Sequence, residues 1–168
     1  GLNRDFRICG SIPKEIYRKE IQIEIHDSEG CNRKLLSAAC GLYYTLYMVQ
    51  PPISGGYPEL AYVYYMHNNG IPLFLNINGR KPISLFGGEE ICAAIDSEGS
   101  VIIVTPSVFD SPTTECQILS LPSGLKAVSA AFCEKSIFSL SSCGRLFESS
   151  FSNKKNRYSS FYEVSELR

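Results

Sequence analysis

The sequence has little of the residue types on which metal binding and bulk electrostatic binding depend. Its 168 residues include no tryptophan and only two histidines, and its net charge is -1. A nearly neutral chain has no general attraction for the phosphates of nucleic acids or for anionic lipid. A metal site needs several Cys, His or carboxylate ligands at short spacing, and His26 near Cys31 is too little for one. We therefore expect no nucleic-acid binding through bulk charge, no metal and no cofactor.

Long apolar runs and helical patterns are also lacking. The longest apolar runs, such as residues 42–49, are about half the length that a membrane-spanning helix needs, so no membrane span is expected. Only residues 12–21 are a candidate for even a short helix. The seven cysteines are odd in number and include no C-x-x-C pair. This favours free thiols in a reducing compartment, the cytoplasm or the nucleus.

The residues that are abundant are typical of strands and turns. Ten tyrosines and nine phenylalanines accompany thirteen glycines and nine prolines, which favours an all-β fold over a helical bundle. Isoleucines at 21, 23 and 25 alternate with polar residues, as on a half-buried strand. Asn-Gly, the strongest short hairpin signal, occurs at 69–70 and at 78–79. We also expect a strand within residues 115–121, a surface loop at 151–160 and the opening of another unit at 161–167.

One outline of apolar run, turn and second run recurs along the chain. It is clearest at residues 125–148, interpreted as two short strands around a turn, and it recurs at 83–104 and more weakly at 35–49. Gly41, Gly88 and Cys133 hold the same place in the three copies, 47 and then 45 positions apart. A period in this range indicates a repeat architecture. The expected units are residues 1–34 (the end of one unit and a connector), 35–81, 82–124 and 125–168.

The order of elements within the copies matches a known pattern. Residues 41–46 read GLYYTL, and the later turn and strand read DSEGSV at 96–101 and SCGRLF at 142–147. This order resembles the regulator of chromosome condensation family of β-propellers, whose blades commonly carry a Gly, two residues, His-Thr or His-Ser, and a later Gly before an aromatic strand. Tyr44, Ile91 and Ser136 stand in the histidine position of the three copies.

The resemblance implies a partial β-propeller of about three blades, each an antiparallel four-stranded sheet. Family members usually close a ring of about seven blades, so the chain is expected to be a fragment of a larger propeller. An incomplete ring leaves open strand edges, which a soluble protein must cover or pair. We expect further sequence, a partner chain or a second copy to cover them.

Aromatic and cationic side chains supply the candidate contacts with a partner. Four tyrosines near the proline-rich residues 51–58 are suited to anchor a protein: Tyr57, Tyr62, Tyr64 and Tyr65. Tyr62 and Tyr64 share a strand face, however, so packing explains them equally well. A cationic cluster, Lys154, Lys155 and Arg157, either contacts phosphate or an acidic protein or is simply solvated.

Small residues at the repeat positions are interpreted as structural. A Cβ would crowd the backbone at four of them, so these are expected to shape the fold and not to line a ligand: Gly41, Gly88, Gly99 and Gly144. Cys40, Cys92 and Cys133 lie at or near such positions, where a buried free thiol acts as a small hydrophobic residue.

The sequence favours a non-catalytic protein-interaction scaffold over an enzyme, because a propeller presents loops on two rims and function resides in such loops. The resemblance supplies the alternative, guanine-nucleotide exchange on a small GTPase, although no rim residue for that activity can be placed here. A third hypothesis is a thiol-dependent hydrolase. It requires Cys92 or Cys133 to be exposed beside a histidine, His26 or His67.

Overall fold

The computed structural model describes residues 33–51, 55–66 and 71–165, and the chain is all-β throughout them. The helical turns in this part are two short 3-10 segments, η2 (Pro106–Phe109) and η3 (Pro122–Gly124). None of its helices is long and apolar enough to cross a membrane. The helix candidate at 12–21, the isoleucines at 21–25 and the Asn-Gly pair at 69–70 lie outside the described residues.

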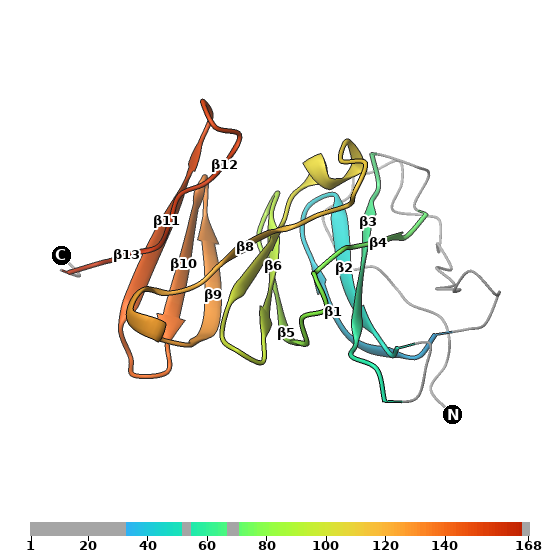
Figure 1. The fold of residues 1–168 in the computed structure, drawn as a ribbon. Coiled ribbons are helices and arrows are strands. Elements are labelled where there is room, and N and C mark those ends of the chain that lie inside the picture. Colours follow the sequence, from blue (N-terminus) through green and yellow to red (C-terminus); the bar gives the residue numbers. More distant parts are fainter. Residues whose placement is uncertain (1–32, 52–54, 67–70, 166–168) are drawn as a thin grey trace.

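The strands form three antiparallel sheets that follow one another along the chain (Figure 1). The first sheet contains β1 (Leu35–Cys40), β2 (Tyr44–Val49), β3 (Glu59–Tyr64) and β4 (Leu73–Phe74). The second contains β5 (Pro82–Gly87), β6 (Cys92–Asp96), β7 (Val101–Val104) and β8 (Gln117–Leu119). The third contains β9 (Ala127–Cys133), β10 (Ser136–Ser141), β11 (Leu146–Ser152), β12 (Arg157–Tyr158) and β13 (Tyr162–Glu163). Both β12 and β13 pair with β11, so they share the fourth position of that sheet.

This arrangement confirms the expected all-β fold of four-stranded antiparallel sheets and changes two expectations about strands. Residues 125–148 form three strands instead of two, because the chain reverses at 134–135 as well as at 142–145. The described residues after 160 do not open a new unit, since β13 returns to the third sheet and pairs Glu163 with Phe147. The strand within 115–121 is β8, and the loop at 151–160 is the tight β11–β12 hairpin.

The first reversal of each sheet has the same register. The Gly41 N–H donates to the Tyr44 carbonyl, the Gly88 N–H donates to the Ile91 carbonyl, and Cys133 pairs with Ser136. Each pair encloses a two-residue connection, at 42–43, 89–90 and 134–135. The three connections therefore stand at equivalent places and face the same end of the sheets.

A second shared feature is the turn that joins β6 to β7 and β10 to β11. Gly99 and Gly144 have φ of 84° and 82°, a region that glycine adopts without strain. Asp96 Oδ1 accepts the Ser100 N–H at 2.8 Å, and Ser141 Oγ accepts the Arg145 N–H at 2.9 Å. The same turn is thus stabilised by a carboxylate in the second sheet and by a hydroxyl in the third.

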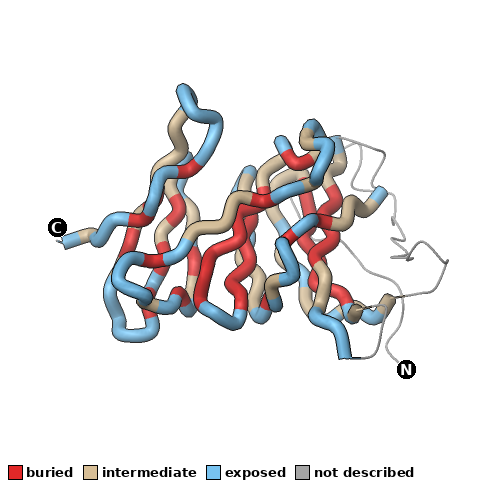
Figure 2. Tube along the Cα trace, in the orientation of Figure 1, coloured by how far each residue is buried: buried red, intermediate tan, exposed pale blue. Residues whose placement is uncertain are grey.

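The sheets bury their faces against one another. One apolar cluster joins the first two sheets and includes Leu46, Leu60, Tyr62, Ala94 and Ile102. Another joins the second and third sheets and includes Ile95, Val101, Ile103, Ile137 and Phe147. Because the second sheet is covered on both faces, β6 and β7 are buried at every residue (Figure 2). The described residues cover the third sheet on one face only, and large apolar side chains are exposed on it, namely Val128, Leu140 and Tyr162.

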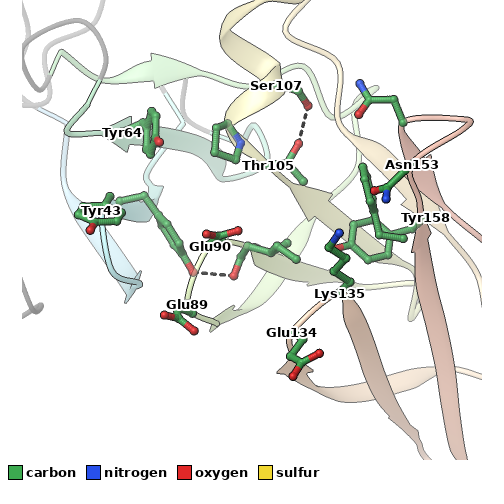
Figure 3. Close-up of a pocket in the computed structure, with 15 residues that line it drawn as sticks. Tyr43, Tyr64, Glu89, Glu90, Thr105, Ser107, Glu134, Lys135, Asn153 and Tyr158 are labelled. Atoms are coloured by element: carbon green, nitrogen blue, oxygen red, sulfur yellow. Dashed lines mark hydrogen bonds between the residues drawn. The ribbon is translucent and has the colours of Figure 1, made fainter.

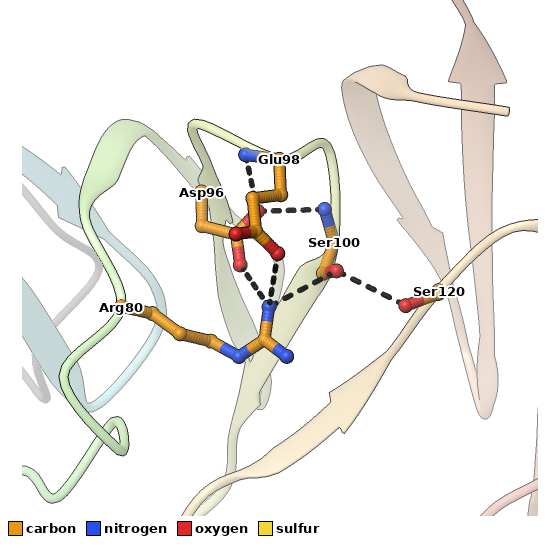
Figure 4. A network of polar contacts seen from close by, with 5 residues as sticks. All are labelled: Arg80, Asp96, Glu98, Ser100 and Ser120. Atoms are coloured by element: carbon orange, nitrogen blue, oxygen red, sulfur yellow. Dashed lines mark hydrogen bonds and ion pairs between the residues drawn. The ribbon is translucent and has the colours of Figure 1, made fainter. Parts of the chain in front are cut away.

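An ion pair fixes the β6–β7 turn against the connection that enters the second sheet (Figure 4). Arg80 Nη1 donates to Asp96 Oδ2 at 2.6 Å and to Ser100 Oγ at 3.2 Å, and Ser100 Oγ lies 3.0 Å from Ser120 Oγ. The Asp96 side chain is 1% exposed, whereas Glu98, 3.7 Å from the same guanidinium, is 80% exposed. Arg80 therefore neutralises a carboxylate that water does not reach.

Replacement of Arg80 by Ala should lower the free energy of unfolding by about 2 kcal/mol. The buried Asp96 carboxylate then loses its cationic partner and keeps only hydrogen bonds from backbone N–H groups. Chemical denaturation measures the change. The matched control is Arg145→Ala, which removes the exposed pair with Glu163 and should change stability little. Equal effects of the two substitutions would show that the Arg80 pair has no special structural role.

Candidate functional site

The connections between strands gather on two rims of the molecule. The first rim holds the two-residue connections at 42–43, 89–90 and 134–135 together with residues 65–66 after β3 and the segments that follow β7 and β11. The second rim holds the glycine turns and the segments that lead from one sheet to the next. A cavity of about 400 Å³ opens on the first rim, and all three sheets line it (Figure 3).

Tyr44 forms the inner wall of this cavity and links the first sheet to the second. Its hydroxyl accepts the Gly88 N–H at 2.9 Å and lies 2.7 Å from the Gly88 carbonyl and 2.6 Å from the Ile91 carbonyl, to one of which it donates. Burial raises the pKa of this hydroxyl far above its usual value, so it stays a donor. The residue that stands in the family's histidine position therefore acts as a hydrogen-bonded bridge between sheets.

Small residues allow the sheets to approach this closely. A Cβ at Gly41 would overlap the Tyr44 ring and the Gly88 carbonyl, and one at Gly87 would overlap the Cys40 carbonyl. A Cβ at Gly88 would lie 2.6 Å from the Phe132 ring of the third sheet. At the tip of the rim, the Leu42 N–H donates to the Glu89 carbonyl at 2.9 Å. Neighbouring connections are thus held in fixed positions relative to one another.

The far wall of the cavity comes from the β11–β12 hairpin. Tyr158 and Phe151 pack edge to face with ring centroids 5.2 Å apart. The Gln117 side chain holds the Tyr158 backbone through two hydrogen bonds, of 2.7 and 2.8 Å, which tie β12 to β8 of the second sheet. Burial, and after it the negative charge of Glu90, raises the pKa of Tyr158 to about 12. The charge of Glu90 therefore acts across the cavity.

Charged side chains surround the opening. Three carboxylates and one ammonium group line it: Glu89, Glu90, Glu134 and Lys135. All four side chains are exposed, and none of them has an ion-pair partner among the described residues. Tyr43, Tyr64 and Pro106 are among the residues that line it on the side of the first two sheets. The arrangement can hold an extended ligand between aromatic walls, with excess negative charge at its edge.

The four tyrosines proposed as anchors do not form one surface. Tyr57 is 56% exposed and lies on the second rim, where Lys81 Nζ is 6.0 Å from its ring centroid. Tyr62 is fully buried between the first two sheets, where it packs in the apolar cluster. Tyr64 lines the cavity, and the hydroxyl of Tyr65 is hydrogen-bonded to Thr45 at 2.8 Å. Only Tyr64 of this set borders the cavity.

The cationic cluster and the repeat glycines lie at separate places. Lys154, Lys155 and Arg157 are exposed on and beside the β11–β12 turn, on the first rim but outside the lining of this cavity. Gly41 and Gly88 lie at the close approach of the sheets, and Gly99 and Gly144 lie in the turns of the second rim.

The cysteines divide between core and surface. Cys92 is buried, and burial raises the pKa of its thiol well above the usual value, whereas Cys40 and Cys133 are exposed. The sequence predicts that Cys40 and Cys133 are buried in the core, but both are exposed because each is the last residue of a strand at the rim. The hydrolase hypothesis required a histidine beside Cys92 or Cys133, and both His26 and His67 lie outside the described residues. No cluster of three potential metal ligands occurs within the described part of the chain.

Alkylation with iodoacetamide at neutral pH should rank the five described cysteines. Hydrogen bonding from Ser141 lowers the pKa of the exposed Cys143 thiol, so Cys143 should react first. Burial raises the pKa of Cys116 from 9.0 to about 12, which reduces its thiolate fraction at neutral pH roughly a thousandfold. Cys92 and Cys116 should therefore react last, as read by mass spectrometry of tryptic peptides. Labelling of either before Cys143 would contradict their burial.

Tyr44→Phe should lower the free energy of unfolding by about 1 to 3 kcal/mol, because it deprives the Gly88 and Ile91 backbone of a buried partner. Tyr62→Phe is the matched control. Its hydroxyl is buried with no hydrogen-bond partner among the described residues, so its removal should leave stability unchanged or raise it. Thermal and chemical unfolding measure both variants. A loss in Tyr62→Phe as large as that in Tyr44→Phe would contradict the bridge.

Three sheets of this kind, stacked face to face with their first strands in contact, define part of a β-propeller. No family model and no curated protein sequence matches the chain. Several solved structures are similar to the chain. Human WBSCR16 is 17% identical with a TM-score of 0.57, and the match covers 90% of this chain and 41% of that one.

Two yeast structures give the same result. Prp20p of Saccharomyces cerevisiae is 12% identical with a TM-score of 0.56, covering 80% of this chain and 40% of Prp20p. Yeast RCC1 (Prp20) bound to Kap60 is 14% identical with a TM-score of 0.56, covering 89% and 42%. The fold of the chain is that of the RCC1-type β-propellers, as the sequence resemblance predicted. The chain spans about two-fifths of the length of these neighbours.

Proposed function

We propose that the chain is part of a β-propeller that works as a non-catalytic protein-interaction module and binds its partner through the first rim. The observation that carries the proposal is the cavity of about 400 Å³ that the connections of all three sheets build together. A second hollow of about 480 Å³ shares Thr105, Ser107, Phe151 and Asn156 with it. Because they share these lining residues, the two hollows adjoin, and we propose that together they receive an extended segment of a partner protein.

The walls of this groove suit protein recognition. Tyr43 and Tyr64 are partly exposed and offer rigid amphipathic surfaces of the kind most often found as anchors at interfaces. The buried Tyr158 supports the opposite wall. The scaffold beneath them is rigid, because the sheets are held by Tyr44 and by the Gln117 hydrogen bonds. Loops on a rigid scaffold are where binding residues concentrate.

The neighbours support a protein partner. The solved structure of Prp20p is described with its binding to Gsp1p and histones, and yeast RCC1 is seen bound to Kap60. We place the module in the cytoplasm or nucleus, since the described cysteines are free thiols. We also propose that further propeller sequence, another chain or a second copy covers the exposed face of the third sheet, where Leu140 is 39% exposed.

Affinity capture from a cell extract, compared across variants, tests the rim. Tyr43→Ala removes a wall of the cavity and Asn153→Trp fills its opening. Each substitution should lower the affinity for a specific partner about tenfold or more. Tyr57→Ala on the second rim is the control and should leave capture unchanged. Circular dichroism verifies that all three variants are folded. Loss of partners with Tyr57→Ala alone would place the binding surface on the other rim.

Nucleotide exchange on a small GTPase is the second candidate, and the likeness to Prp20p is the observation that favours it. Nucleotide-loaded GTPases incubated with the chain separate the two functions. Faster nucleotide release would identify exchange activity, whereas binding without faster release would support the interaction module.

A further inference from the structure

We infer that the partner segment received by the first-rim cavity is basic, with lysine or arginine side chains seated against Glu89 and Glu90. This inference rests on the proposed function and names the chemistry of its partner. It starts from the uneven distribution of charge around the groove.

The carboxylates at the opening are uncompensated. Glu89 and Glu90 form one two-residue connection and Glu134 belongs to the next. Among the described residues of the lining, Lys135 is the single cation. The cavity therefore carries two more negative than positive charges. Figure 3 shows Glu89 and Glu90 on the edge contributed by the second sheet, below Tyr43 and Tyr64.

The backbone that carries these carboxylates is held in place. The Gly88 N–H donates to the Tyr44 hydroxyl and to the Ile91 carbonyl. These hydrogen bonds fix the backbone at both ends of the connection at 89–90. The Glu89 carbonyl in turn accepts the Leu42 N–H. Because the backbone of the connection is already held by these bonds, little backbone conformational freedom is lost when a cation binds there.

Aromatic walls add to the preference for cations. Tyr43 and Tyr64 stand beside the carboxylates, and a guanidinium or ammonium group between them gains attraction from the ring faces as well as from the charges. The charge of Glu90 already affects Tyr158 on the opposite wall. A guanidinium fits this arrangement best, because its planar fork pairs with a carboxylate while its face stacks on a ring.

The other charges near the groove do not favour an acidic ligand. Lys154, Lys155 and Arg157 are exposed on the β11–β12 hairpin, and of these only Arg157 lines the second hollow. Glu115 lines the same hollow. A phosphate or an acidic peptide at the first-rim cavity would face three carboxylates, so nucleic acid is disfavoured there.

Selection of a phage-displayed library of random dodecapeptides on the full chain tests the inference. We expect the enriched peptides to be rich in lysine and arginine. Fluorescence anisotropy of an enriched peptide should show about threefold to tenfold weaker binding to Glu90→Gln and weaker binding as salt is added. Lys135→Gln should bind it more tightly. The control, Glu98→Gln on the second rim, loses the same charge and should bind it unchanged.

The outcomes separate this inference from the proposed function. If the selection enriches acidic or uncharged peptides whose binding is lost in Asn153→Trp, the inference of a basic partner is wrong, whereas the proposed interaction function remains supported. Basic peptides that bind equally to Glu90→Gln and Glu98→Gln would overturn the inference too, as would a selection that enriches no peptide. If Tyr43→Ala and Asn153→Trp also retain every captured protein, the proposed function fails as well.

Discussion

The close approach of the first strands of neighbouring sheets is the constraint on which the rest of the structure depends. Gly41 leaves no room for a Cβ, because the Tyr44 ring of its own sheet and the Gly88 carbonyl of the second sheet fill that space, and a Cβ at Gly87 would overlap the Cys40 carbonyl of the first sheet. The Tyr44 hydroxyl then satisfies the Gly88 backbone that this approach buries. A larger residue at either glycine would separate the sheets, and with them the apolar cluster that joins the first two.

The same constraint builds the binding surface. Since the three first reversals share one register, their two-residue connections come to the same rim and border one cavity. The first two connections are joined through their backbones, by the Leu42–Glu89 hydrogen bond, and the side chains that the connections present at the rim are available for binding. In this chain they are Leu42 and Tyr43, then Glu89 and Glu90, then Glu134 and Lys135. Aromatic and acidic groups therefore meet at the rim although they are far apart in sequence.

The sequence predicted the repeat well because glycines mark its turns. Strand composition and the spacing of Gly41, Gly88 and Cys133 predicted an all-β repeat. The order of elements within the copies led to the resemblance to RCC1-type propellers, and the resemblance implied the four-stranded sheets. Strand composition could not separate β9 from β10, since the reversal at 134–135 contains no glycine or proline. The cavity was missed for a related reason. Tyr43, Glu89 and Glu134 become neighbours only through packing of the sheets, although aligning the copies at their connections would have grouped them.

Contacts between the sheets can be observed directly by nuclear Overhauser spectroscopy on the intact chain. The Gly88 methylene faces the Phe132 ring, since a Cβ at this position would lie 2.6 Å from the ring. The Gly88 N–H lies 2.9 Å from the Tyr44 hydroxyl. We expect strong cross-peaks from the Gly88 protons to the Phe132 ring and from the Gly88 amide to the Tyr44 ring. Intact cross-strand signals within each sheet but none between Gly88 and these two rings would contradict the stacking of the three sheets.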